Sequence, residues 1–412
     1  MTVELERLGR LRVYQQSTYT DASGVGGMLD VDALEDTIKP SRPQKMLPVK
    51  SVAQRRLQYP ESVLGPKSSA LDFSWNLVSH GLDLDGDVAV PTASTWWQAT
   101  IMKTMMGGID TETIPAAQTT VQAGTTATVV NVTAGHGARF KKGVAIGCVV
   151  PASGGGTAYE CREVLSVATD AVSVKVAFSD VPTTATAVRR SVTVYRTERP
   201  ATWLQFAYEG KVALDRWDFR GMQGALSYAF TWGELITASA KLMGSTWTNL
   251  GSGTLSAATY SYNTPVPMVN MELLIATVGA TTRTVCPFGA LSWEPEQGWI
   301  DQKGGTGSET IVQKIASRPD VAPLRVKITE PFEDLTRFTS RDSRTDHALF
   351  LQSGNTVGGT VLFAAPTGQL IEPERAPQDA LAGQTWTFQA REDSAGAVST
   401  ELDLSCERLH FM

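Results

Sequence analysis

Strict alternation of apolar and polar residues marks the clearest elements along the chain. Between residues 71 and 77 every second side chain is apolar, and this period of two predicts a half-buried strand. Residues 225–242 hold two longer alternating runs, one on each side of residues 233–235. If both apolar rows share a face, Trp232 opposes Ile236 and the residues between them form a three-residue loop. The pattern therefore predicts a long hairpin.

One face of this hairpin is apolar, and the other carries small or polar side chains. The polar face contains the candidate ring-forming residues: Ser227, Ala229, Thr231, Thr237, Ser239 and Lys241. A long flat hairpin with free edges must pair with something or risk aggregation, and closing hairpins into a ring removes those edges. The competing interpretation is an ordinary hairpin inside a closed sandwich.

Helix signals are few. Thr95 to Gln98 reads as a Thr-x-x-Gln capping box, and Trp97, Ile101 and Met105 follow at helical spacing. Gly107 suits the left-handed residue that ends a helix. We therefore expect one amphipathic helix of about three turns lying on a sheet.

The chain divides by texture into a core and an insertion. Residues 1–112 and 200–262 form the predicted first half of the core, with a long irregular arm at 15–67 that is rich in Pro and Gly. Residues 113–199 are rich in Thr, Val, Ala and Gly and predict a separate small β-barrel. Residues 263–412 repeat the element order of the first half.

The remaining predicted elements are short. In the insertion we expect strands at 128–133, 143–150, 163–167 and 171–176; in the second half we expect a helix at 331–337 and strands at 324–328, 347–351, 360–363, 385–389 and 402–406. The predicted fold class is mainly β: a β-sandwich or barrel core with one or two short helices and two similar halves, plus the inserted small β-barrel domain.

Composition agrees with this class and excludes several functions. Of 412 residues, 42% are apolar and 19% charged, and the formal net charge is −6, so a basic stripe for nucleic acid is not expected. The four cysteines, Cys148, Cys161, Cys286 and Cys406, show no CxxC spacing, so we expect reduced thiols. If a bridge exists, the first two form it. The N-terminus lacks a secretory apolar region, and no run reaches the roughly 18 apolar residues that span a bilayer.

A search for chemistry finds no catalytic or cofactor motif. The four histidines are scattered, and neither a G-x-S-x-G elbow nor a P-loop occurs. Carboxylates alternate from Asp83 to Asp87, but Gly and Glu are not at EF-hand spacing, which favours a solvated turn over a calcium site. Most tryptophans follow apolar parities; Trp217 and Trp299 are the candidates for exposed contacts. We expect no enzyme, no metal and no cofactor.

With these elements in place, the chain resembles the tail tube (major tail) proteins of tailed bacteriophages. The resemblance is carried by residues 11–19, by Met105-Met-Gly-Gly108, by Trp203-Leu-Gln-Phe-Ala-Tyr-Glu-Gly210, by residues 219–230, by Glu234-Leu-Ile-Thr-Ala-Ser-Ala-Lys-Leu-Met-Gly244 and by Val361-Leu-Phe-Ala-Ala-Pro366. The insertion departs from a minimal tube subunit and looks like a decoration domain on the tube exterior.

The resemblance implies a structural virion protein, assembled in the host cytoplasm, with itself as main partner. Subunits would form stacked rings, preferably hexamers, or trimers with pseudo-sixfold geometry, around a lumen through which DNA passes only as cargo. The small polar face would line that lumen, with Lys241 as an exception that could instead pair with a carboxylate on a neighbour, and the arm at 15–67 would contact the next ring. Other implied partners are the tail terminator, tape measure and distal tail proteins, but no membrane. The alternatives are a tail-tip adhesin or carbohydrate- or receptor-binding β protein, an enzyme with an unrecognised site, and a capsid or cement protein.

Overall fold

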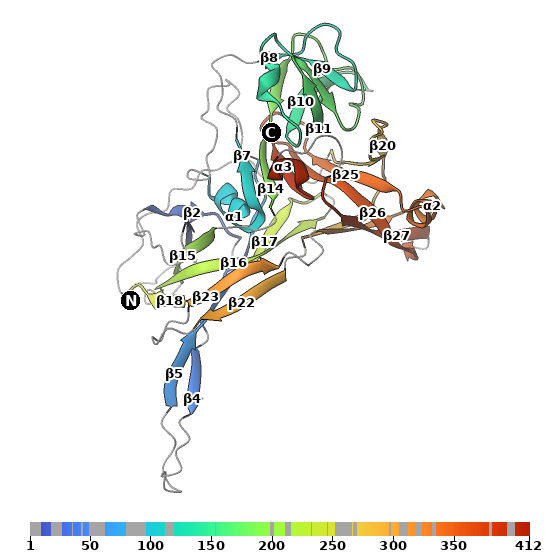
Figure 1. Ribbon diagram of the computed structural model, residues 1–412. Helices are drawn as coiled ribbons and strands as arrows, with labels where there is room; N and C mark the ends of the chain where they lie inside the picture. Colours follow the sequence, from blue (N-terminus) through green and yellow to red (C-terminus); the bar gives the residue numbers. More distant parts are fainter. Residues whose placement is uncertain are drawn as a thin grey trace, which may run out of the picture.

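A computed structural model gives the fold. It describes residues 10–17, 27–34, 36–42, 44–48, 62–79, 96–111, 119–152, 154–197, 202–210, 216–231, 233–244, 246–251, 266, 270–295, 298–304, 312–318, 324–331, 335–378, 381–393 and 400–412. The predicted class is confirmed: the chain is mainly β, with large antiparallel sheets (Figure 1).

The elements follow one another in two comparable series. The first half contains β1 (Arg10–Gln16), β2 (Leu29–Val31), β3 (Lys39–Ser41), β4 (Gln44–Pro48), β5 (Ser62–Lys67), β6 (Ser69–Asn76), α1 (Trp97–Met106), β7 (Gly107–Asp110), β14 (Val192–Arg196), β15 (Trp203–Glu209), β16 (Arg216–Phe230), β17 (Thr237–Gly244) and β18 (Thr246–Asn249). The second half contains β19 (Glu272–Thr277), β20 (Thr284–Val285), β21 (Ala290–Glu294), β22 (Gly298–Gly304), β23 (Val312–Arg318), β24 (Arg325–Glu330), α2 (Leu335–Asp342), β25 (Asp346–Ser353), β26 (Val361–Gln378), β27 (Leu381–Ala390), α3 (Glu401–Leu404) and β28 (Arg408–Phe411).

A continuous antiparallel path of strands crosses both halves. Its order is β3-β6-β17-β16-β21-β24-β27-β26, so β16 and β21 join the first half to the second. The two long strands change partners along their length. The first part of β16 pairs with β15 and β18 and its last part with β17 and β21, while β26 pairs first with β25 and β28 and then with β27. These changes of partner bend the sheet into a half-barrel.

The predicted hairpin exists, but its register differs from the prediction. Thr237 pairs with Ala229, whereas the sequence reading set it opposite Thr231. The connection is longer because the Ile236 amide donates to the carbonyl of Val266, which takes Ile236 out of the hairpin ladder. The shift preserves parity, so the apolar and polar faces are as predicted; Trp232 lies outside the described residues.

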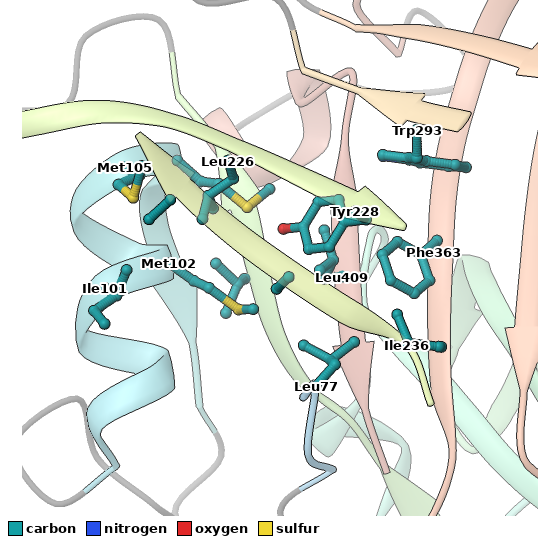
Figure 2. Close-up of a cluster of buried hydrophobic side chains, with 14 of the residues drawn as sticks. Leu77, Ile101, Met102, Met105, Leu226, Tyr228, Ile236, Trp293, Phe363 and Leu409 are labelled. Atoms are coloured by element: carbon teal, nitrogen blue, oxygen red, sulfur yellow. The ribbon is translucent and has the colours of Figure 1, made fainter. Parts of the chain in front are cut away.

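The apolar face of this path packs on one core shared by both halves. In Figure 2, Tyr228 of β16 and Trp293 of β21 converge on Phe363 of β26, with ring centroids 5.2 and 5.5 Å from it. Met102 and Met105 of α1 approach the same core from the other side. Burying these rings and thioethers together fixes the two halves against each other.

The inserted sheet is separate from the main sheet and has its own core. Its strands are β8 (Thr119–Thr120), β9 (Val129–Asn131), β10 (Ala145–Pro151), β11 (Thr157–Ala168), β12 (Ala171–Val174) and β13 (Ala187–Arg190), in the spatial order β8-β13-β10-β11-β12-β9. A 3₁₀ turn, η2 (Gly137–Arg139), connects two of them. β14 pairs with β7 and β28, so the chain re-enters the main sheet before residue 199, earlier than predicted.

Two predicted helix starts and one predicted strand need correction. α1 begins at Trp97 with Trp96 as N-cap and no side-chain cap, so the box at residue 95 is wrong, while Gly107 does end the helix with φ of 111°. α2 begins at Leu335, later than the predicted 331. Residues 402–406 are not a strand, because Thr400 and Asp403 form a reciprocal capping box that starts α3.

The segment 15–67, predicted as an irregular arm, contains strands where it is described. β2 pairs with β1, and β3 pairs with β6. β4 and β5 form a two-stranded ribbon that extends away from the rest of the molecule at the bottom of Figure 1. A second ribbon, β22–β23, lies close to β16.

Candidate assembly surface

The predicted polar face of the hairpin is present, on the side of the strands that points away from the apolar core. Thr237 pairs with Ala229 and Ser239 with Ser227, and all four are half-buried or exposed while their neighbours along each strand are buried. Lys241 lies exposed on the same face. Thr231 is exposed but lies beyond the last pair of the ladder, so it is not part of the wall.

This polar face extends beyond the hairpin onto the neighbouring strands. The sequence did not predict that extension. The neighbouring strands add polar residues of the same parity: Asp72, Ser74 and Asn76 on β6, Ser292 and Glu294 on β21, Arg325, Lys327 and Thr329 on β24, and Thr385, Thr387 and Gln389 on β27. Alternation in each strand was the available signal, but it does not say which strands are neighbours.

Short hydroxyl side chains bridge neighbouring strands across the face. Ser74 and Ser239 share a hydrogen bond of 2.7 Å between their hydroxyls, and Thr329 and Thr385 share one of 3.2 Å. Lys241 lies opposite Asp72 of its own chain in the register of β17 and β6. The result is a polar wall in which Ser and Thr predominate and charges of both signs are interspersed, an arrangement that does not favour tight binding of a polyanion.

The path of strands has two margins with no partner among the described residues. At one end, β3 pairs only with β6. At the other end, residues 370–378 of β26 pair with β27 on one side, and no described strand pairs with their other side. Unpaired strand margins present amide and carbonyl groups to any strand that can align with them; Pro40 of β3 and Pro373 and Pro377 of β26 present carbonyl groups only.

The base of the β4–β5 ribbon is held by aromatic rings. Trp217 and Trp247 stack edge to face at 5.1 Å, with the Arg42 guanidinium 3.7 Å from the Trp217 centroid and the Lys67 ammonium 4.6 Å from that of Trp247. Trp217 is thus half-buried in an internal contact rather than free for a ligand, and the side chain of Trp299 lies outside the described residues.

A buried ionic cluster fixes the inserted sheet to the main body. Arg408 of β28 donates to Glu163 of β11 at 2.5 Å and to Asp393 at 3.1 Å, and Lys175, the residue after β12, bridges the same two carboxylates at 2.7 and 2.6 Å. Arg408, Glu163 and Asp393 side chains are fully buried. Burial opposes ionisation of Glu163, yet Arg408 and Lys175 hold its pKa well below the usual value.

His410 makes this cluster sensitive to acid. Burial lowers the pKa of His410 from its ordinary 6.5, despite Glu163 nearby, and its Nδ1 lies 2.9 Å from the Thr193 hydroxyl. Because the unfolded chain takes up this proton more readily, stability is expected to fall as the pH drops below 6.5. His347, whose pKa burial also lowers, acts in the same direction.

Urea denaturation at a series of pH values tests this. We expect His410→Asn to flatten the loss of stability between pH 6.5, the ordinary pKa of histidine, and pH 4.5, that of glutamate, and the double variant with His347→Asn to flatten it further. Below pH 4.5 protonation of Glu163 adds a loss that both variants retain. A slope in His410→Asn equal to that of the unmodified protein would contradict the assignment.

A second buried network fixes the inserted sheet at another point. Arg162 of β11 donates to Glu160 at 2.7 Å and to Glu272 of β19 at 2.9 Å, and Gln352 of β25 accepts from the Cys161 amide at 2.8 Å. Two polar contacts on different strands hold the inserted sheet in one orientation.

All four cysteines are free and buried, as the sequence predicted. Cys148 and Cys161 do not form the alternative bridge. Burial raises the pKa of the Cys406 thiol to about 12 and those of the other three still higher, so these thiols are unreactive packing groups.

Neither a metal cluster nor a membrane helix is found in the part of the chain that the structure describes. No group of three or more His, Cys, Asp or Glu side chains there could hold a metal ion, and Asp83–Asp87 lies outside it. Within the same part, no helix has the length and apolar character needed to cross a bilayer.

No protein-family model matches this chain, and no curated protein matches it. Evidence about function therefore comes from the geometry of the sheet.

Proposed function

We propose that the chain is a structural virion protein that assembles with copies of itself into the stacked rings of a phage tail tube. The observation that supports this most is the half-barrel path of strands, with a polar face and, among the described residues, an unpaired margin at each end. Strands from neighbouring copies extend the path until it closes, which removes every margin.

The chemistry of the face suits a conduit for DNA. Hydroxyl and small side chains dominate it, and its lysines and arginines stand beside carboxylates or neutral groups, so a sliding duplex meets no continuous cationic stripe. Tight Lys–phosphate contacts would retain the DNA rather than let it pass. The role is therefore structural rather than catalytic, in the virion tail, with DNA as cargo.

The repeated halves allow two ring sizes. Six copies, or three copies in which each half acts as one unit, both close a ring through head-to-tail contacts. The inserted sheet, fixed by its two buried polar networks, is a rigid decoration on the exterior. A tail-tip adhesin is the alternative, and it would remain a small finite oligomer with an exposed aromatic groove.

Electron microscopy of the purified protein at high concentration tests the proposal. We expect hollow tubes of uniform diameter, and the mass of one ring measured by native mass spectrometry distinguishes three copies from six. A protein that stays monomeric at all concentrations, or stops at a compact oligomer without a lumen, would contradict the tube.

A further inference from the structure

The two halves correspond strand by strand. In both, a first strand pairs with a short second one (β1–β2, β19–β20) and with the strand that precedes the longest strand of its half (β1–β15, β19–β25). In both, a long bent strand pairs with the strand that follows it, which in turn pairs with the strand before the helix (β16–β17–β6, β26–β27–β24). The second half has no counterpart of β7, of the inserted sheet or of β14, since β25 begins four residues after α2 ends.

The hydroxyl pairs fix the register between the halves. Ser239 and Ser74 occupy the same places on β17 and β6 as Thr385 and Thr329 occupy on β27 and β24, and both pairs are hydrogen-bonded. Counting along the ladders from these pairs sets Ala376 of β26 at the place of Ala229.

The same count sets β3 at the place of β21. Both strands pair with the strand before the helix of their own half, and Lys39 of β3, opposite Asp72, corresponds to Ser292 of β21, opposite Lys327. Within the chain, the end of β16 pairs with β21 through only three residue pairs, with Ala229 opposite Ser292. The equivalent contact, between β26 and β3, cannot form within one chain, because these strands are the opposite ends of the path.

The ribbons show the same asymmetry. The second-half ribbon lies against the first half, where β23 contacts β16 and β17 (Figure 1). The equivalent contact of the first-half ribbon, β4–β5, would be with β26 and β27. That ribbon instead projects from the body (Figure 1).

We infer that a second copy of this chain completes both contacts: β26 of one copy pairs with β3 of the next, whose β4–β5 ribbon lies across β26 and β27. This joint repeats between copies the contact that joins the halves within a copy, and it rests on the proposed function. Lys39 stands opposite Ala376 of the neighbour. The contact is heterologous, and such contacts generate a ring when the rotation between copies closes.

Charge on the two margins supports the pairing. The free margin of β26 carries the exposed side chains of Glu372, Glu374 and Arg375, and β3 carries exposed Lys39. With Ala376 opposite Lys39, Glu374 is its diagonal neighbour on the same face, within reach of a lysine side chain.

Disulfide trapping tests the joint. Directly opposed residues of an antiparallel pair have the separation that a disulfide needs. We expect Lys39→Cys with Ala376→Cys to give a ladder of covalent oligomers on oxidation, and each single variant to give none. Ala229→Cys with Ser292→Cys is the matched control, because the same geometry there gives a bond within one chain. The native thiols are buried and do not interfere.

The outcomes separate this inference from the proposed function. If tubes form but only the internal control cross-links, the inferred joint is wrong while the proposed tube function stands. A chain that never associates would overturn both. As a second measurement, Lys39→Glu or Glu374→Lys should weaken association about two- to fivefold, and combining them should restore it. If the double variant associated as weakly as the single variants, the pairing of Lys39 with Glu374 would be wrong.

Discussion

Replacing Arg408 with alanine is expected to destabilise the protein by about 3–5 kcal/mol, because it leaves buried carboxylates without their cation. Arg408 bonds Glu163 and Asp393, and its guanidinium also donates to the carbonyls of Leu402 and Asp403. Lys175 alone cannot neutralise both acids or reach these carbonyls. Chemical denaturation measures the change.

Two further variants make this prediction specific. Arg391 forms an exposed pair with Asp346, in which the side chains are 53% and 39% accessible, so Arg391→Ala should change stability by less than about 1 kcal/mol. Arg408→Lys keeps the charge but loses the planar fork, so an intermediate loss is expected. If Arg408→Ala and Arg391→Ala lost the same amount, the cluster would not stabilise the junction.

The strands of the half-barrel were the most predictable part of the fold. Each strand has one buried and one exposed face, so apolar and polar residues alternate along segments such as 225–242. The sequence has no comparable pattern that shows which strands lie next to each other in the sheet. The contact of β17 with β6, or of β16 with β21, depends on chain closure over many residues, and only the fold reveals it.

The errors have identifiable physical causes. Leu402 and Leu404 alternate as in a strand, but over so short a run a helical turn satisfies the same pattern, and the Thr400 cap decides between them. The hairpin register failed because the amide of Ile236 bonds to Val266, a residue distant in sequence. Local turn rules could not anticipate that partner.

The sequence predicted part of the candidate surface. Five of the six predicted side chains lie on one wall, because parity survives a register shift of two. The free margins were expected only in general terms. Identifying β3 and β26 required the correspondence between the halves, which sequence identity does not display but the ladders do.

Phe363→Ala should destabilise the protein about as much as Arg408→Ala. Phe363 is fully buried where the halves meet, and the rings of Tyr228, Phe230 and Trp293 contact it edge to face (Figure 2). Truncating it removes these contacts and leaves a cavity, at a cost of about 3–5 kcal/mol.

The closely related variant Phe363→Leu distinguishes lost packing from a general sensitivity of β26. Leucine fills most of the space, so a loss of about 1–1.5 kcal/mol is expected. Because the cluster joins β16 to β21 and β26, Phe363→Ala should also lower tube formation at temperatures where the leucine variant still assembles. Denaturation midpoints and electron microscopy of the same samples measure both effects. Equal stability losses for alanine and leucine would show that the aromatic cluster does not hold the halves together.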